Sequence, residues 1–227
     1  MPLLCYLTSF IFNRTKLLKK AAEFRKLRPK PYFCYVKMFE FQSKTKAAQG
    51  KFLLAEPFLE DPYFKRSVIY LVEHNDKGSL GFILNKPIDL KINNALVGFP
   101  EYKESLYLGG PVQRDQLYFL HRLGNRIEKS IEIADGIYWG GDFEVVKDMI
   151  ESKIILPDEI RFFVGYAGWT SNQLNDEIKS KSWIVADART EQVFNLDTKH
   201  LWSNVMKSIG GKEFAIMSNF PEDPNLN

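Results

Sequence analysis

Apolar residues along the chain fall mostly in short runs bounded by glycine, proline and small polar residues, a pattern typical of β-strands. The run 67–74 is apolar at consecutive positions, so it predicts a strand that is covered on both faces. The turn residues 75–78 should join it to 80–85 in a hairpin. The predicted strands are 50–55, 67–74, 80–85, 106–108, 117–121, 131–133, 161–164, 183–186 and, less regular, 192–194.

Other segments repeat apolar residues every three or four positions, as amphipathic helices do. Asp142 is a suitable N-cap for a helix whose core-facing residues are Phe143, Val146, Met149 and Ile150. Thr198 is the expected cap of a helix near 198–209, which presents Leu201, Trp202, Val205, Met206 and Ile209 and which Gly210 and Gly211 should end. The predicted helices are 92–96, near 142–151, about 171–180, and near 198–209.

Because strands arrive in runs with only three substantial helices, the pattern favours an α+β fold over a doubly wound parallel sheet. About 190 residues follow Met38, enough for one sizeable core. No repeat, low-complexity tract or linker divides them. The sequence therefore predicts a single compact α+β domain flanked by three to four helices.

The segment from Arg161 to Leu174 carries the most information. An apolar strand runs into Gly165 and Gly168, which allow backbone angles or close approaches that a Cβ would prevent. We expect the chain to reverse sharply there and to enter a helix through a capping box made by Thr170 and Gln173. The favoured interpretation is a packed structural corner, and the alternative is an anion site at the start of the helix.

Charge divides the chain in two. Residues 1–37 contain nine Lys or Arg and one acid, a net charge of +8, whereas residues 38–227 contain 22 bases and 27 acids, a net charge of −5. Both cysteines, Cys5 and Cys34, lie in the basic segment. We therefore expect a basic N-terminal extension (1–37) and a mildly acidic domain (38–227) suited to the reducing cytoplasm.

The extension places its apolar part, Leu3 to Phe12, before its basic part, the reverse of a secretory signal. About ten apolar residues cannot cross a bilayer of about 30 Å, so no membrane span is expected. A transit peptide and a basic arm for membrane or nucleic acid stay open as readings. We favour upstream sequence, with Met38 as the natural start.

Several motifs in order resemble the AlgH/YqgE family over about Gly50 to Asn227. No single motif is specific, but their order is. They are 50–55 with 61–68, Glu73-His74 with Gly78 and Gly81, 84–87, 109–112, 138–142, 165–169 with Gln173, Leu174 and Glu177, and the tail 221–227.

The resemblance implies a compact α+β domain whose bent, mixed sheet forms a pseudo-barrel, and a natural start near Met38. It also implies the label of bacterial transcriptional regulator, which comes from a member linked to alginate production. The family has no agreed biochemical activity, so the resemblance leaves the mechanism open.

The sequence contains no recognisable catalytic or metal motif. His74, His121 and His200 are far apart and none belongs to an HxxxH or HExxH pattern, so we expect no metal and no cofactor. Ser67 lacks a nucleophile elbow. The alternative is an enzyme with an unrecognised site around His74 and Arg66.

A ligand site is predicted if Asn85, the Gly109-Gly110 turn and the 165–169 corner meet at one edge of the sheet. They would offer an amide, free N–H groups and aromatic walls to a small ligand or peptide. The full set of candidates is Arg66, His74, Asn85, Gly109, Gly110, Tyr166, Gly168, Trp169 and Gln173.

Direct sequence-specific DNA binding is not expected, because the acidic domain offers no basic recognition helix for phosphate contacts. We expect a regulator to act by binding another protein or a small molecule. A pure protein-interaction module is the further alternative, and it would show a large exposed apolar patch.

Overall fold

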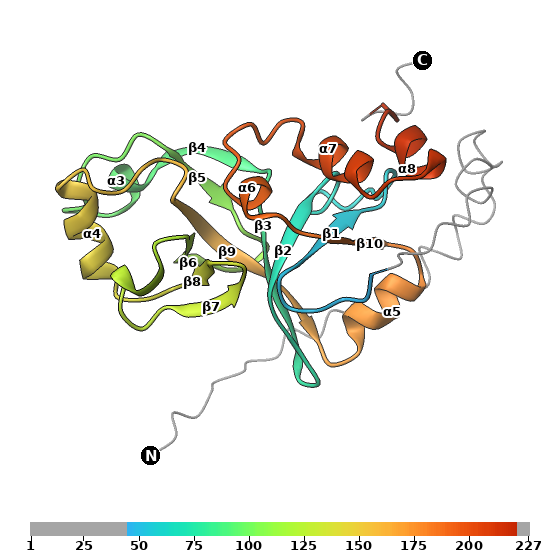
Figure 1. Ribbon diagram of the computed structural model, residues 1–227, viewed down its shortest axis with the longest axis horizontal. Coiled ribbons are helices and arrows are strands. Elements are labelled where there is room, and N and C mark those ends of the chain that lie inside the picture. The colour runs from blue at the N-terminus through green and yellow to red at the C-terminus, as the bar shows by residue number, and fades with distance from the viewer. Residues whose placement is uncertain (1–44, 222–227) are drawn as a thin grey trace. The chain divides into compact units, whose positions relative to one another are not determined.

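The computed structural model describes residues 45–221 (Figure 1). The strands are β1 (Lys51–Ala55), β2 (Val68–Asn75), β3 (Gly78–Ile83), β4 (Pro87–Lys91), β5 (Ser105–Leu108), β6 (Val112–His121), β7 (Ile131–Ala134), β8 (Ile137–Trp139), β9 (Ile160–Thr170) and β10 (Trp183–Asp187). The helices are α3 (Ile92–Ala95), α4 (Phe143–Glu151), α5 (Gln173–Lys179), α6 (Thr190–Val193), α7 (Leu201–Ser208) and α8 (Lys212–Met217).

The strands form one mixed sheet in the order β10-β1-β2-β3-β9-β6-β8-β7. Neighbours along this path are antiparallel, while β5 joins β9 in parallel and carries β4 on its other side. The long strand β9 therefore pairs with β3, β5 and β6. The hairpin predicted from 67–74 and 80–85 is confirmed as β2 and β3.

The sheet curls so that the end of β7 returns to the start of β1. Gln49 Nε2 donates to the carbonyl of Ile133 at 3.2 Å, and Thr190 Oγ1 donates to the carbonyl of Asp135 at 3.1 Å. The predicted α+β fold with a bent, mixed sheet is thus confirmed. Among the described residues no helix is both long and apolar enough to cross a membrane.

Three apolar clusters fill the two sides of the sheet because strand side chains alternate between faces. On β1, Phe52 and Leu54 belong to the cluster under α6, α7 and α8, while Leu53 and Ala55 belong to the cluster under α5. A third cluster lies under α3 and α4. The first five residues of β2 are buried on both faces, as its continuous apolar run predicts.

The predicted sharp reversal after the strand 161–164 is wrong, because β9 continues to Thr170. Gly165 has φ of 69°, but its role is close approach: an added Cβ would lie 2.7 Å from the Gly110 carbonyl oxygen. Gly168 stays in the ladder opposite β3. The glycines thus let a continuous strand pass close to its neighbours.

Helix α5 begins at Gln173, two residues later than predicted, and only half of the capping box forms. Gln173 Oε1 accepts from the Thr170 N–H at 3.0 Å. The Thr170 hydroxyl donates to the same oxygen at 3.2 Å instead of accepting from the helix. Asn172, with φ of 63°, occupies the N-cap position.

The other helices give mixed outcomes. Asp142 caps α4 as predicted, since Oδ1 accepts from the Glu144 N–H at 3.1 Å. The strand expected at 192–194 is wrong because these residues lie in or directly after α6. Thr198 makes no side-chain cap on α7, whose N-cap is His200. With α6 and α8 the described residues contain six helices, more than the three to four predicted.

Residues 1–37 lie outside the described part of the chain. The basic extension and the domain boundary at Met38 therefore stay predictions.

Candidate functional site

Arg66 anchors the last described residues to the sheet. Its Nη2 donates to the carbonyls of Phe220 at 2.8 Å and Pro221 at 2.7 Å. The guanidinium also lies 4.1 Å from the centre of the Trp202 ring, a cation–π contact. With only 9% of its surface exposed, Arg66 holds structure together.

The side-chain amide of Asn85 is hydrogen-bonded to backbone groups of the segment 66–68. Its Oδ1 accepts from the Val68 N–H at 2.8 Å, and its Nδ2 donates to the Arg66 carbonyl at 2.7 Å. Both ends of the amide are therefore used where β2 begins.

Gly109 and Gly110 lie against β9. The Gly109 N–H donates to the Val164 carbonyl, and the Ile83 N–H donates to the Gly109 carbonyl, both at 2.9 Å. A Cβ on Gly110 would lie 2.1 Å from the carbonyl carbon of Tyr166, which only glycine avoids. This turn thus contributes close packing, and its Gly109 N–H is not available to a ligand.

Two tryptophans share one carboxylate beside α5. The indole N–H groups of Trp169 and Trp183 donate to Glu177 Oε2 at 2.9 and 2.8 Å. Gln173 Nε2 donates to Glu177 Oε1 at 3.0 Å. This arrangement, the Glu177 clamp, fastens α5 to the sheet.

The structure does not bring the sequence-predicted candidates into one site. Arg66 and His74 lie at opposite ends of β2, about 26 Å apart for eight extended residues. Asn85 lies beside Arg66, whereas Gly109 and Gly110 lie beside Tyr166. Of the candidates, His74 lines the pocket described next.

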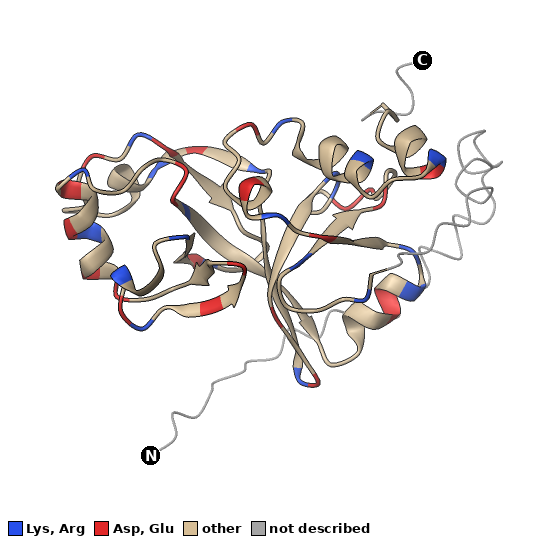
Figure 2. Ribbon diagram, viewed as in Figure 1, with Lys and Arg blue, Asp and Glu red and all other residues tan. Residues whose placement is uncertain are grey.

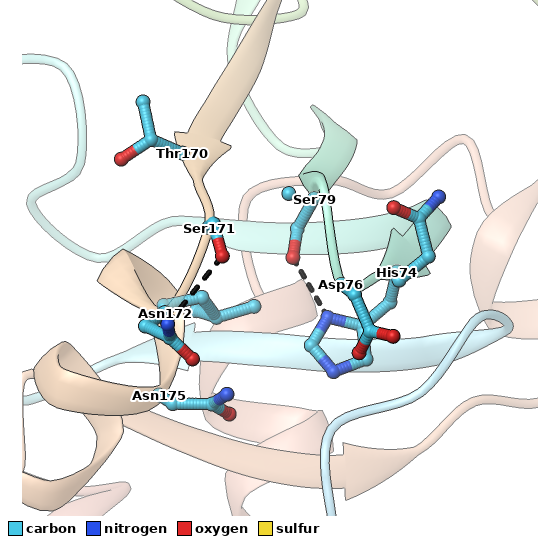
Figure 3. A pocket seen from close by; sticks show the side chains of 10 residues that line it. His74, Asp76, Ser79, Thr170, Ser171, Asn172 and Asn175 are labelled. Carbon is cyan, nitrogen blue, oxygen red and sulfur yellow. Dashed lines mark hydrogen bonds between the residues drawn. The ribbon is translucent and has the colours of Figure 1, made fainter.

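That pocket, the His74 pocket, has a volume of about 460 Å³ and lies between the β2–β3 hairpin and the β9–α5 connection. Figure 3 shows His74, Asp76 and Ser79 on one side and the segment from Thr170 to Asn175 on the other. Its lining residues are His74, Asn75, Asp76, Gly78, Ser79, Thr170, Ser171, Asn172, Leu174 and Asn175.

Local turn chemistry builds the hairpin side of the pocket. Asn75 Oδ1 accepts from the Lys77 N–H at 2.8 Å, which tightens the turn. An added Cβ on Gly78 would lie 2.4 Å from the Trp169 carbonyl oxygen, so a glycine lets β9 approach. His74 Nδ1 and Ser79 Oγ are hydrogen-bonded at 2.7 Å across the hairpin, which fixes the imidazole (Figure 3).

Three polar groups of the lining have no partner among the described residues. They are the carboxylate of Asp76, the side-chain amide of Asn175 and Nε2 of His74. Together with nearby hydroxyls they offer hydrogen bonds to a small polar molecule. The described residues contain no group of three or more His, Cys, Asp or Glu side chains placed to hold a metal ion.

Comparison with known proteins places the fold in a family. A family model described as AlgH-like matches residues 52–213. The chain belongs to the AlgH-like family. A UPF0301 protein of Chlorobaculum parvum is 46% identical over 178 residues, which cover 78% of this chain and 95% of that protein. A UPF0301 protein of Cytophaga hutchinsonii is also 46% identical, over 79% of this chain and 98% of its own length.

Two solved structures share the AlgH-like fold at 26% identity. The crystal structure of protein DIP2367 from Corynebacterium diphtheriae gives a TM-score of 0.66 over 81% of this chain and 97% of that one. The solution structure of the AlgH protein from Pseudomonas aeruginosa gives 0.62 over 79% and 99%. The family resemblance predicted from the ordered motifs is therefore confirmed.

Two other ionisable groups of this AlgH-like chain are structural. His121 is fully buried, and desolvation lowers its pKa to about 4 despite the Gly140 carbonyl that favours the charged form. Its Nδ1 accepts from the Leu123 N–H at 3.2 Å, so the neutral ring carries its proton on Nε2. Arg161 is buried under Tyr107 and donates to the carbonyls of Leu84 and Asn195.

Sequence reasoning found His74 but missed the rest of the pocket. The sequence places Asp76 only in a turn and 170–175 only at a helix start, and it gives Ser79 no role. The signal available was two clusters of turn residues, at 75–78 and 170–172. Nothing in one sequence shows that they face each other.

Proposed function

We propose that the protein is a regulator that acts by binding a small polar ligand in the His74 pocket and not by contacting DNA. The observation that carries this proposal is the meeting of unpartnered polar groups from two distant segments, Asp76 with His74 and Asn175, around one cavity of about 460 Å³. Such a volume suits a small metabolite.

Rigid surroundings support a binding role. On one side of the pocket, Ser79 fixes the orientation of the His74 imidazole, and on the other side the Glu177 clamp holds α5 against the sheet. A preorganised pocket loses less conformational freedom when it binds.

The charge distribution supports the exclusion of DNA as a direct partner. In Figure 2 basic and acidic residues alternate over the described elements, without a basic stripe along one helix. The exposed side of α4, for example, carries Glu144, Asp148 and Glu151 beside Lys147. Phosphate contacts each require Lys or Arg. A cytoplasmic location belongs to the same proposal.

The proposal is tested with the ¹⁵N-labelled full chain and a library of polar fragments. Fragments that occupy the pocket should shift amide signals of residues 74–79 and 170–175. The variant Asn175→Phe, which fills the cavity from α5, should abolish these shifts, whereas Asn204→Phe on the exposed side of α7 should keep them. A library without hits at these amides would refute the proposal.

The exclusion of DNA is tested by electrophoretic mobility shift at moderate salt. We compare the full chain with a variant in which the nine Lys and Arg of residues 1–37 are Gln. Sequence-selective retardation by both proteins would overturn the exclusion. Retardation by the unchanged chain alone would assign binding to the extension.

A further inference from the structure

The polar groups of the His74 pocket define the chemistry of its ligand, an inference that rests on the proposed function. Asp76 is an acceptor only, and it has no ion-pair partner among the described residues. Asn175 can both donate and accept, and Nε2 of His74 does one or the other according to the tautomer. The preference for a donating ligand group therefore comes from the Asp76 carboxylate.

The formal charge of the pocket lining is negative. Of the described residues around the cavity, Asp76 carries the formal charge, and none is Lys or Arg. An anion such as phosphate would face the solvent-exposed carboxylate of Asp76 and find no Lys or Arg in the described lining. An ammonium group, with three N–H donors and a positive charge, is complementary to that carboxylate.

The remaining lining adds hydroxyls and amides. Ser79, Thr170 and Ser171 supply hydroxyl groups, while Asn172 and Asn175 supply amides. None of the described lining residues is Phe, Tyr or Trp, so a nucleobase has no stacking surface here. Hydroxyl, amide and carboxylate groups together match a ligand that carries hydroxyls of its own.

We propose that the His74 pocket binds a small amine-bearing polyol, with its ammonium group at Asp76 and its hydroxyls between the hairpin and the start of α5. Leu174, the aliphatic residue of the described lining, packs into the core, so the contacts with the ligand are mainly polar. His74, oriented by Ser79, presents Nε2 to a hydroxyl.

Three probes, titrated into the ¹⁵N-labelled full chain at pH 7, test whether the pocket prefers a cationic, a neutral or an anionic ligand. Glucosamine carries the ammonium group, N-acetylglucosamine keeps the ring without the charge, and inorganic phosphate carries the opposite charge. Glucosamine should shift amides 74–79 and 170–175 and bind about fivefold more tightly than N-acetylglucosamine. Phosphate should leave these amides unchanged.

The variant Asp76→Asn should lower glucosamine affinity to that of N-acetylglucosamine and leave the latter unchanged. The matched control Asp89→Asn removes an exposed carboxylate on β4, outside the pocket, and should retain the full preference. Equal affinities of the two sugars, an unchanged preference in Asp76→Asn, or binding of phosphate would each overturn the inference.

The two proposals fail differently. If none of the three probes binds while other fragments shift the pocket amides, the ligand class is wrong and the binding function stands. If no fragment of any class shifts them, the binding function itself is refuted.

Discussion

His121 lies on β6 with none of its surface exposed, and its titration should make the fold sensitive to acid. In the unfolded chain the imidazole takes up a proton near pH 6.5, whereas burial lowers its pKa in the folded protein to about 4. Between these values the unfolded state binds more protons. The free energy of unfolding therefore falls as the pH drops from 6.5 to 4, and the His121 contribution is complete above 6.5.

The size of this loss follows from the two pKa values. The difference between 6.5 and about 4 corresponds to about 3.4 kcal/mol at about 1.36 kcal/mol for each pH unit. Domains are stable by roughly 5–15 kcal/mol, so this single group removes a large part of the total. The Gly140 carbonyl, which accepts from Nε2 and favours the charged ring, offsets only part of the desolvation, and the pKa of about 4 already includes this offset.

Urea unfolding of the full chain and of His121→Gln, followed by tryptophan fluorescence at several pH values, measures the effect. Other titrating groups cancel in the difference between the two proteins. That difference should change by about 3 kcal/mol between pH 7.5 and 4 in favour of the glutamine variant. His200→Gln, which removes an exposed histidine, is the control. The reasoning would be refuted if the free energy of unfolding of His121→Gln depended on pH in the same way as that of His200→Gln. It would also be refuted if NMR showed that His121 titrates near pH 6.5 in the folded protein.

Three further substitutions test the structural assignments by urea unfolding. Glu177→Ala leaves two indole N–H groups without an acceptor and should cost about 1–3 kcal/mol, whereas Asp176→Ala should cost less than about 0.5 kcal/mol; equal losses would contradict the clamp. Gly110→Ala forces a Cβ to within 2.1 Å of the β9 backbone and should cost more than about 2 kcal/mol, compared with about 1 kcal/mol for Gly98→Ala, whose Cβ meets open space. Asn85→Ala removes the acceptor of a strand N–H and should cost about 1–3 kcal/mol; an unchanged midpoint would show that the amide is dispensable.

Local patterns predicted much of the fold. The hairpin of β2 and β3 follows from apolar runs around a turn, and α4 follows from Asp142 and an amphipathic stripe. These features depend on neighbours within a few residues. The motif order correctly predicted the family and, through it, the curled sheet.

The errors concern features that depend on distant segments. The sequence suggests a corner at the glycines of β9, because their neighbours in space, such as Gly110, lie more than 50 residues away along the chain. The residues 192–194 are apolar enough for a strand, yet the sheet ends at β10 and they turn into α6. The His74 pocket depends on the register that places Ser79 opposite Trp169. One sequence does not contain that register.

The pairing of the first and the last strand of the described residues constrains how the protein is made. β1 pairs with β10, and Lys51 reaches Asp187, 136 residues later. While a ribosome is still extending the chain, β1 can pair with β2 but its other edge has no partner until β10 emerges. Arg66 likewise cannot meet Phe220 and Pro221 until these residues, more than 150 positions later, have emerged. The nascent domain therefore completes its sheet late, and until then an open strand edge is available to chaperones or to neighbouring nascent chains.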